Sequence, residues 1–315
     1  MKEGAYHTPV LLNYCIEALC IRTEGIYVDA TFGGGGHSRE ILKRLTKGKL
    51  FAFDCDEDAV KNNIKDDRFT LIIKNFRELK TALLAHKVTA IDGLLADLGV
   101  SSHQFDSPER GFSTRFDSEL DMRMGKKEGK LSAAKIIHTY SEEKLKRIFW
   151  EYGELKNASQ VVRKIVLNRN QIRTVNELKN AIAVCAEKGK ENQFYAKVFQ
   201  ALRIEVNDEL NSLKELLMQS VELLKDNGRI AVISYHSLED RLVKNFFRSG
   251  KFEGDAEKDI FGNEQTPLKP INRKPIIPSE EEITQNSRAR SAKLRIAEKC
   301  PSRPPLQGGE RAKKI

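Results

Sequence analysis

The sequence lacks the patterns that mark membrane, secreted and zinc-binding proteins. It has no long apolar run, and its N-terminal stretch M-K-E-G-A-Y-H-T-P is polar rather than signal-like. No C-x-x-C pair occurs among its five cysteines, which stand far apart at Cys15, Cys20, Cys55, Cys185 and Cys300. These absences argue against a membrane span, a disulfide framework and a zinc site. We therefore expect a cytoplasmic protein with reduced thiols and no bound metal.

Positive charge is present in excess and is unevenly placed. The chain has 315 residues, 40% of them hydrophobic, which suits one large domain or two modest ones, and a net charge of +9. Lys126 to Lys190 holds 15 Lys and Arg against 7 Asp and Glu, a net +8, and Lys269 to Ile315 holds 12 against 5, a net +7. Because Lys and Arg neutralise phosphates, both segments are expected to face nucleic acid, although a solvated surface with a basic tail would give the same count.

The stretch from Ile26 to His37, I-Y-V-D-A-T-F-G-G-G-G-H, predicts a ligand-holding turn. An apolar run carrying Asp29 stops at four consecutive glycines, and S-R-E-I-L-K-R-L follows with helical spacing. Strand, tight turn and helix in this order are typical of ligand sites in α/β sheets, although a plain connection has the same outline. Glycine lets a ligand approach the backbone closely, and the helix start offers unpaired N–H groups.

The glycines do not match the dinucleotide fingerprint G-x-G-x-x-G. Three residues after Gly35 and Gly36 stand Ser38 and Arg39 instead of a third glycine. Close helix packing at a pyrophosphate is then disfavoured, which favours a nucleoside ligand without a diphosphate. About twenty residues beyond the glycines, the run K-L-F-A-F-D ends at Asp54, at the spacing where an acidic side chain accepts ribose hydroxyls.

Strands alternate with helices along the first part of the chain, which predicts a parallel sheet with right-handed crossovers. The expected strands lie near 26–29, 49–54, 68–76, 91–99 and 229–236. Functional side chains should stand where these strands end, since those ends share one rim. The residues expected on this rim are Gly33 to His37, Asp54, Phe76, Asp97 and His236. His236 is read either as a substrate contact or as an orienting or packing residue.

Capping patterns place several helix boundaries. The predicted helix starts are Thr8 with Pro9, Ser141, Thr174 with Glu177, and Ser237 with Asp240, and a helix stop is predicted at Asn227-Gly228. Short closing strands are expected at Pro275 to Pro278 and in A-R-S-A-K-L-R-I-A-E-K, whereas Ser249 to Pro270 shows no motif.

A second, helical unit is expected to interrupt the sheet domain. The pattern changes at Ser107 to a loop rich in glycine and charge, and amphipathic stretches follow. Three aromatic residues are expected in the core of this unit rather than as base-stacking platforms: Phe149, Trp150 and Tyr152. The division expected is a sheet domain from 1–106 and 206–298, a helical insert from 107–205, and a disordered basic tail from 299–315.

Eight stretches of the sequence closely resemble the bacterial ribosomal RNA small subunit methyltransferase H family, also called MraW. They are H-T-P-V-L-L at His7, D-A-T-F-G-G-G-G-H-S at Asp29, D-G-L-L-A-D-L-G-V-S-S at Asp92, E-R-G-F-S at Glu109, L-D-M-R-M at Leu120, F-Q-A-L-R-I at Phe199, H-S-L-E-D-R at His236 and S-R-A-R-S-A-K-L-R at Ser287. The stretches span nearly the whole chain, and several are long and peculiar to that family.

The resemblance implies an α/β, Rossmann-like class I S-adenosylmethionine-dependent methyltransferase with an inserted helical substrate-recognition domain. Its implied reaction is N4-methylation of a cytidine in the decoding region of small-subunit (16S) ribosomal RNA. The family's cofactor positions fall on Gly35, Gly36, His37, Asp54, Phe76, Asp97 and Gln104. The implied partner is 16S ribosomal RNA or the small ribosomal subunit, with no membrane partner, and a homodimer is left open.

The sequence departs from the family pattern in the insert. Y-G-E-E is replaced by Y-G-E-L, which ends at Leu155, and an Arg-Thr pair is replaced by Lys197-Val198. Lysine does not reproduce the bidentate fork of arginine on a phosphate, so these departures bear on RNA docking.

For catalysis, we expect Asp97 to accept a hydrogen bond from the cytosine amino group and to align it, with His236 nearby. The target base must also leave its stack to enter the pocket. Methylation at C5 would need a cysteine nucleophile, and Cys55 is the one cysteine expected near this rim. Three rivals stay open: a nicotinamide oxidoreductase, a DNA or RNA amino-methyltransferase with another target, and a non-catalytic RNA-binding assembly factor.

Overall fold

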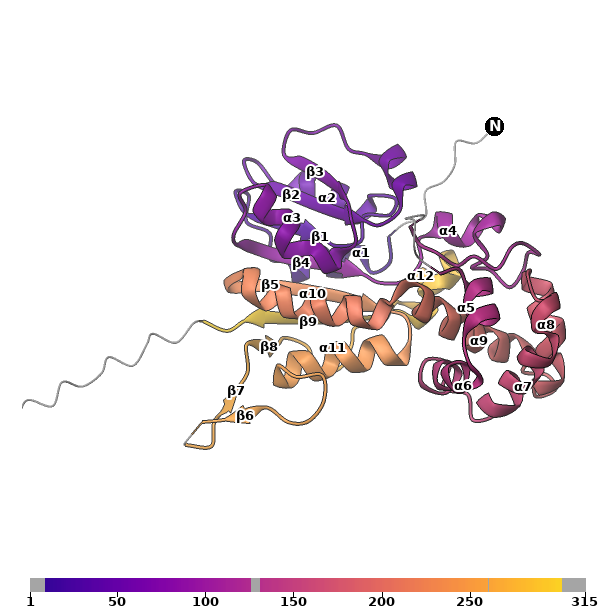
Figure 1. Ribbon diagram of the computed structural model, residues 1–315. Helices are drawn as coiled ribbons and strands as arrows, with labels where there is room; N and C mark the ends of the chain where they lie inside the picture. The colour runs from indigo at the N-terminus through magenta and orange to yellow at the C-terminus, as the bar shows by residue number, and fades with distance from the viewer. Residues whose placement is uncertain (1–8, 126–130, 260, 302–315) are drawn as a thin grey trace, which may run out of the picture.

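A twisted seven-stranded sheet forms the centre of the computed structural model, which describes residues 9–125, 131–259 and 261–301 (Figure 1). Its strands are β1 Ile26–Asp29, β2 Lys49–Asp54, β3 Phe69–Ile73, β4 Ile91–Asp97, β5 Leu224–Ser234, β8 Leu268–Pro270 and β9 Lys293–Lys299. Their order is β3-β2-β1-β4-β5-β9-β8. The first five strands are parallel, while β9 pairs antiparallel with both β5 and β8. The parallel α/β sheet predicted from the sequence is confirmed.

The strand order reverses between β1 and β4. From β1 the chain proceeds to β2 and β3 on one side, and from β4 to β5 on the other. Such a reversal opens a crevice outside the carboxyl ends of the strands, which is where α/β sheets bind ligands. Both central strands are almost wholly buried, because helices cover both faces of the sheet.

The helices form two covering layers and a separate unit. Their bounds are α1 Leu12–Ala18, α2 Gly36–Arg44, α3 Leu79–Ala85, α4 Ser102–Asp106, α5 Ala133–Thr139, α6 Glu142–Glu151, α7 Ala158–Asn168, α8 Val175–Ile182, α9 Glu191–Asn207, α10 Glu209–Leu223, α11 Ser237–Ser249 and α12 Glu280–Gln285. Helices α3, α10 and α11 pack in one core with the sheet, and α1 and α2 pack in a second core with it.

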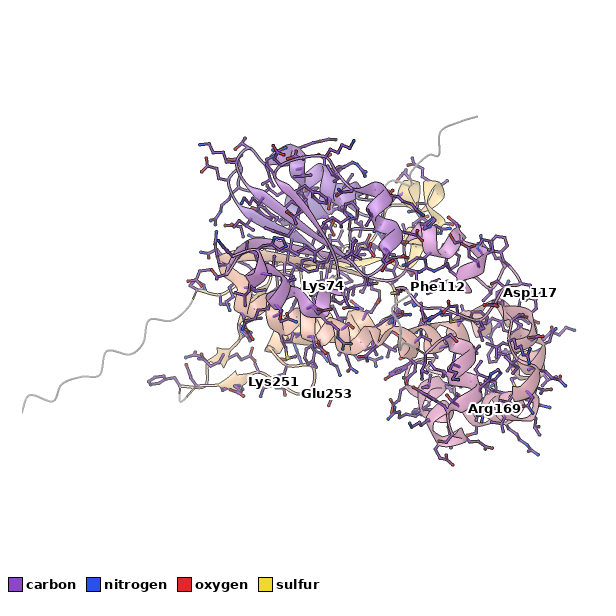
Figure 2. The ribbon with its side chains drawn as sticks, turned by 45° about the horizontal axis from the view of Figure 1, so that its top comes forward. Lys74, Phe112, Asp117, Arg169, Lys251 and Glu253 are labelled. Atoms are coloured by element: carbon purple, nitrogen blue, oxygen red, sulfur yellow. The ribbon has the colours of Figure 1, made fainter. Side chains whose placement is uncertain are left out.

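Helices α5 to α9 form a helical unit beside the sheet (Figure 1). Their apolar faces meet in a third core, which runs from Phe112 to Val206. Figure 2 shows Phe112 where the two units meet, and Asp117 and Arg169 within the helical unit. The chain leaves this unit through a sharp break at Asp208, which takes a left-handed φ of 51° between α9 and α10.

The predicted start of the first helix and the predicted end of the helix before β5 are both wrong. Helix α1 begins at Leu12 after a left-handed Leu11, so Pro9 does not start it, and Thr8 lies outside the described residues. Helix α10 ends at Leu223, and Asn227 lies within β5 with a φ of 64°, near an irregularity in the pairing of β5 with β4. The predicted starts at Ser141 and Thr174 are confirmed, the latter as a full capping box.

The C-terminal part holds more regular structure than the sequence indicates. The stretch without a motif contains β8 and a small hairpin of β6 Glu257–Lys258 and β7 Glu264–Gln265. The first predicted closing strand is reduced to a single bridge from Ile276 to Leu294, while the second is β9. Lys299, placed with the tail by the sequence, ends β9, and residues 302–315 lie outside the described part of the chain.

Within the described residues, no helix has both the length and the apolar character required to cross a bilayer.

Candidate functional site

The glycine turn between β1 and α2 is shaped by close packing. Gly33 and Gly35 have left-handed φ values of 50° and 74°, which favour glycine. Gly36 begins α2, and a Cβ at this position would overlap the ring of Pro9. The segment entering α1 therefore lies directly on the turn, and only glycine leaves room for it.

Asp29, at the end of β1, stabilises the glycine turn through hydrogen bonds. Its carboxylate accepts hydrogen bonds from the hydroxyl of Ser38 at 2.6 Å and from the backbone N–H of Thr31 at 3.1 Å. The side chain is buried, and burial raises its pKa, although these hydrogen bonds oppose the rise. Asp29 thus braces the glycine turn and is shielded from solvent.

Asp54 ends β2 beside the glycine turn, as the sequence predicted. It accepts hydrogen bonds from the backbone N–H of Gly33 at 2.8 Å and of Asp56 at 2.9 Å. Burial raises its pKa to about 6, against the lowering effect of these two bonds. Each carboxylate oxygen keeps further lone-pair capacity, so the group can still accept hydrogen bonds from a ligand.

Asp97 ends β4 across the strand-order reversal from the turn. Its Oδ1 accepts a hydrogen bond of 2.7 Å from the hydroxyl of Tyr235, and its backbone N–H donates to Thr31. Burial raises its pKa to about 6, although His37 and the Tyr235 bond pull it down. The Asp97 side chain keeps 22% exposure. It is therefore anchored on one oxygen and accessible enough to meet a substrate.

His37 lies within the same group but is turned inward. Its Nδ1 is 3.9 Å from Oδ2 of Asp97, and its Nε2 is 3.1 Å from the carbonyl oxygen of Val10. Burial lowers its pKa, although Asp97 opposes the shift, so the neutral ring dominates at neutral pH. His37 links the N-terminal segment to the rim.

Phe76 and Gln104 occupy different surroundings from the carboxylates. Phe76 begins a short 3-10 helix after β3 and lies half-buried against the core of the sheet. Gln104 is buried, donates to Asp56 at 2.8 Å and to the carbonyl of Met124 at 3.2 Å, and completes the capping box of α4 with Ser101. Its side-chain N–H groups are thus already used in bracing the loop beside Asp54.

His236 caps α11 instead of ending β5. Its Nδ1 accepts the backbone N–H of Glu239 at 3.4 Å, so the predicted cap of Ser237 with Asp240 is wrong by one residue. Glu239 in turn accepts the N–H of Tyr235 at 2.9 Å. The His236 ring thereby fixes the turn that carries Tyr235 to Asp97.

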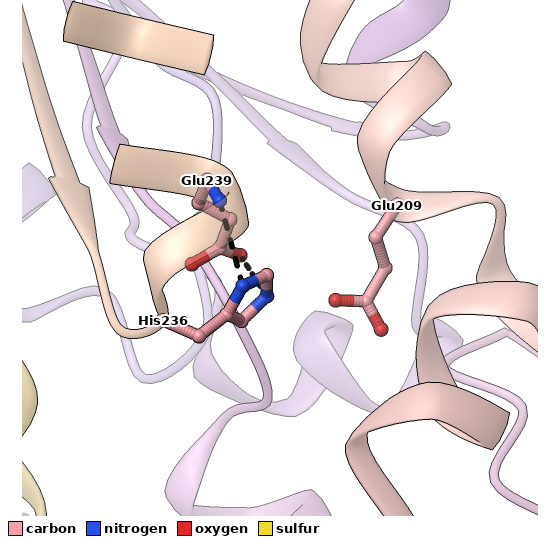
Figure 3. Close-up of side chains that lie close together, drawn as sticks. All are labelled: Glu209, His236 and Glu239. Carbon is pink, nitrogen blue, oxygen red and sulfur yellow. Dashed lines mark hydrogen bonds and ion pairs between the residues drawn. The ribbon is translucent and has the colours of Figure 1, made fainter. Parts of the chain in front are cut away.

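Glu209 lies close to this cap and joins it to the helical unit. One carboxylate oxygen each of Glu209 and Glu239 and one ring nitrogen of His236 lie within 4.8 Å of one another (Figure 3). Such atoms could bind a metal ion. Arg203 binds both oxygens of Glu209 at 2.8 Å, which already neutralises that carboxylate. Burial raises the Glu239 pKa, but His236 and Arg203 outweigh it and leave the pKa below its ordinary value. Arg203 thus offsets the charge of Glu209, one of the two carboxylates in the cluster.

Cys15 lies near this rim, although the sequence placed only Cys55 there. Burial raises the pKa of its thiol well above the ordinary value, and the nearby Asp97 raises it further. Cys15 has no exposed surface, so it is a protonated thiol that no substrate reaches. It does not serve as a nucleophile.

Residues far apart in the sequence therefore form one acidic rim. Asp29, Asp54 and Asp97 surround the glycine turn at the strand-order reversal. Such a rim suits a ligand that combines a nucleoside with positive charge. Tyr235 was missed by the sequence reasoning, although it directly precedes His236, because nothing local indicates its partner 138 residues away.

Comparison with known proteins identifies the family of the chain. The family model described as "MraW methylase family" matches residues 4–300. A relative from Christiangramia forsetii, named ribosomal RNA small subunit methyltransferase H, is 57% identical over 93% of this chain and 98% of its own. Relatives of the same name from Cytophaga hutchinsonii and Bacteroides fragilis are 56% and 54% identical, over 93% and 95% of this chain and 99% of their own. With nearly its whole length matched, the chain belongs to the MraW methylase family.

Proposed function

We propose that this chain transfers the methyl group of S-adenosylmethionine to the exocyclic N4 of a cytidine in the decoding region of small-subunit ribosomal RNA. Membership of the MraW methylase family and the names of the relatives support the reaction class and the substrate. The choice of N4 and of the decoding region rests on the resemblance of the sequence motifs. The observation that carries the proposal is the position of Asp97, accessible and anchored by Tyr235 at the end of β4.

The acidic rim fits the cofactor. S-adenosylmethionine supplies a positively charged sulfonium that carries the methyl group to be transferred. Gly35 gives the turn before α2 its left-handed backbone, and Asp54 offers oxygen acceptors for ribose hydroxyls. Phe76 provides an apolar wall, while Gln104 acts by holding Asp56 and the adjoining loop. Burial raises the pKa of these carboxyl groups because it disfavours their ionised form. A nearby cation stabilises that ionised form.

Asp97 positions the acceptor. The N4 lone pair of cytosine is delocalised into the ring, so the amino group is a weak nucleophile and depends on alignment. With Oδ1 held by Tyr235, Oδ2 is free of that bond and can accept a hydrogen bond from the amino group. His236 holds Glu239, and Glu239 orients Tyr235. Because Tyr235 binds Asp97, His236 acts on Asp97 only indirectly.

The helical unit supplies the main surface for RNA. The segment from Lys126 to Lys190 holds a net +8, and its described residues form helices α5 to α8. The three departures from the family pattern fall mostly in its interior, because Leu155 and Val198 are buried and only Lys197 is part-exposed. They therefore bear on packing more than on phosphate contact. We propose the insert as the substrate-recognition domain.

The proposal is tested by incubating wild type and Asp97→Ala with labelled S-adenosylmethionine and small ribosomal subunits. Wild type should place the label on N4 of a cytidine, as digestion to nucleosides and mass spectrometry would show. Asp97→Ala should transfer at least a hundredfold more slowly, the loss typical of one preorganised acceptor. Label on C5, label on DNA in preference to RNA, or undiminished transfer by the variant would each contradict the proposal.

A further inference from the structure

A pocket of about 260 Å³ lies beside the acidic rim. It is formed by the turn from β5 to α11 and by the segment between β8 and β9, and it includes Tyr235 and His236. Lys293 at the start of β9 pairs with Ser234 at the end of β5, so the pocket lies over the C-terminal end of β5. In the sheet order β1-β4-β5-β9, it is the next position after Asp97, on the side away from the glycine turn.

The walls of this pocket combine apolar, aromatic and cationic groups. Ile277, which is 64% exposed, and Pro278 contribute apolar surface to the lining of the pocket. Arg290 is exposed on the other side and makes no ion pair with another described residue. Lys293 is partly neutralised, since it lies 3.4 Å from Asp240. Arg290 is thus the cation with the most capacity to bind an anion.

The size and chemistry of the pocket favour part of a polymer. Sites for whole small-molecule ligands measure about 300–1,000 Å³, so this pocket is small for one. Apolar and aromatic walls accept the face of a base, and an arginine fork accepts a phosphate. The lining also includes one acidic residue, Glu280, which is exposed at the start of α12. Its negative charge disfavours a free polyanion that would fill the whole pocket.

We propose that this pocket binds one nucleotide of the RNA substrate, adjacent to the methylated nucleotide, with its phosphate on Arg290 and its base against Ile277 and Pro278. The proposal rests on the proposed function, since it takes the acceptor to lie at Asp97. A nucleotide held here anchors the strand next to the base that has left its stack. The pocket therefore contributes to the choice of sequence around the target as well as to affinity.

The experiment measures RNA binding and cofactor binding separately. The variants are Arg290→Ala and Ile277→Asp, both at exposed positions, with matched controls Arg273→Ala and Ile271→Asp, which lie in the same segment outside the pocket. Binding of small subunits, and of a single-stranded RNA with the decoding-region sequence, is measured over a range of salt concentrations. The affinity for S-adenosylmethionine is measured for every variant, to show whether the substitution disturbs cofactor binding at the acidic rim.

Arg290→Ala should weaken RNA binding about tenfold and reduce the slope of log affinity against log salt by about one. Arg290→Lys should restore the slope and part of the affinity, because the charge returns without the fork. Ile277→Asp should also bind RNA more weakly, while both controls and all cofactor affinities stay at the wild-type values.

The inference is overturned if Arg290→Ala matches Arg273→Ala, or if Ile277→Asp binds RNA as wild type does. Loss of cofactor affinity in either pocket variant would also overturn it, since the pocket would then belong to the cofactor site. Failure of the proposed function has a different signature, in which wild type binds RNA and transfers no methyl group to N4.

Discussion

Single residues in this protein owe their chemistry to burial at strand ends. Asp54 and Asp97 were predicted from the sequence because each closes an apolar run, and an acidic residue there faces the rim of a parallel sheet. Their raised pKa values could not be predicted, because they depend on neighbours brought together by the fold. Tyr235 and Cys15 were missed for the same reason, since their relation to Asp97 exists only in three dimensions.

The raised pKa of Asp97 predicts a pH-dependent stability. Folding raises this pKa from 3.8 to about 6, so the folded chain holds the proton more tightly than the unfolded chain. The resulting stabilisation is fully present below pH 3.8 and is lost as the pH rises through about 6. Asp97→Asn escapes this loss. Its free energy of unfolding relative to wild type should therefore increase by on the order of 2 kcal/mol between pH 4 and pH 7 without cofactor.

Denaturant unfolding at the two pH values measures this difference. Asp67→Asn, at an exposed aspartate, serves as the control and should keep a constant difference from wild type. A difference for Asp97→Asn that is the same at pH 4 and pH 7 would show that Asp97 titrates normally in the folded chain.

At the scale of elements, helix α6 shows why one aromatic prediction is wrong. Phe149 is buried and Tyr152 packs against the same core, as expected, but Trp150 is 58% exposed. Each residue on a helix turns about 100° from the one before, so Trp150 lies about 200° from the buried Ile148 and about 100° beyond Phe149, away from the core. Lys146 and Arg147 lie one turn before Trp150 and are exposed as well. An indole beside two cations is a surface suited to stacking with an unpaired base.

Trp150→Ala should therefore weaken binding of small-subunit RNA by about 1–3 kcal/mol, the range for loss of one base stack. Leu167→Ala is the control, because Leu167 is 70% exposed on α7 of the same unit. Both variants should unfold at wild-type denaturant concentrations. Equal RNA affinities of the two variants would show that Trp150 does not stack on a base of the RNA.

The cap of α11 gives a second lesson at this scale. The sequence H-S-L-E-D-R offers two pairs with capping spacing, His236 with Glu239 and Ser237 with Asp240. Serine is the commoner cap, yet the structure uses histidine. Ser237 is instead engaged by Glu154 of the helical unit at 2.8 Å, and Asp240 by Arg295 of β9 at 2.6 Å. Tertiary partners thus decided between two local options.

At the scale of the whole molecule, the predictable part of the fold is the parallel sheet and its helical interruption. Continuous apolar runs marked the parallel strands, while short strands such as β8 pair through distant partners and leave little local signal. The junction between the two units was likewise not predictable. Glu154 bridges them, accepting hydrogen bonds from Ser237 at 2.8 Å and from Arg241 at 3.1 Å.

Glu154→Ala should loosen the helical unit from α11 and raise the KM for ribosomal RNA several-fold, with the cofactor affinity unchanged. The loss of stability should stay below about 1 kcal/mol, because exposed ion pairs contribute little. Steady-state kinetics and hydrogen exchange at the start of α11 measure the two effects. Glu151→Ala, at an exposed glutamate of α6, is the control. An unchanged KM with unchanged exchange would show that the junction does not depend on this contact.

The packing of Pro9 on Gly36 bears on when the proposed cofactor site is completed during synthesis. Leu11, two residues after Pro9, donates its backbone N–H to the carboxylate of Glu282 at 2.7 Å, across 271 residues of sequence. A nascent chain that has emerged only as far as β4 contains the whole glycine turn and the contact of His37 with Val10, but it lacks the carboxylate of Glu282 that binds Leu11. The segment that packs on the turn therefore gains its hydrogen bond to Glu282 only after nearly the entire chain has been synthesised.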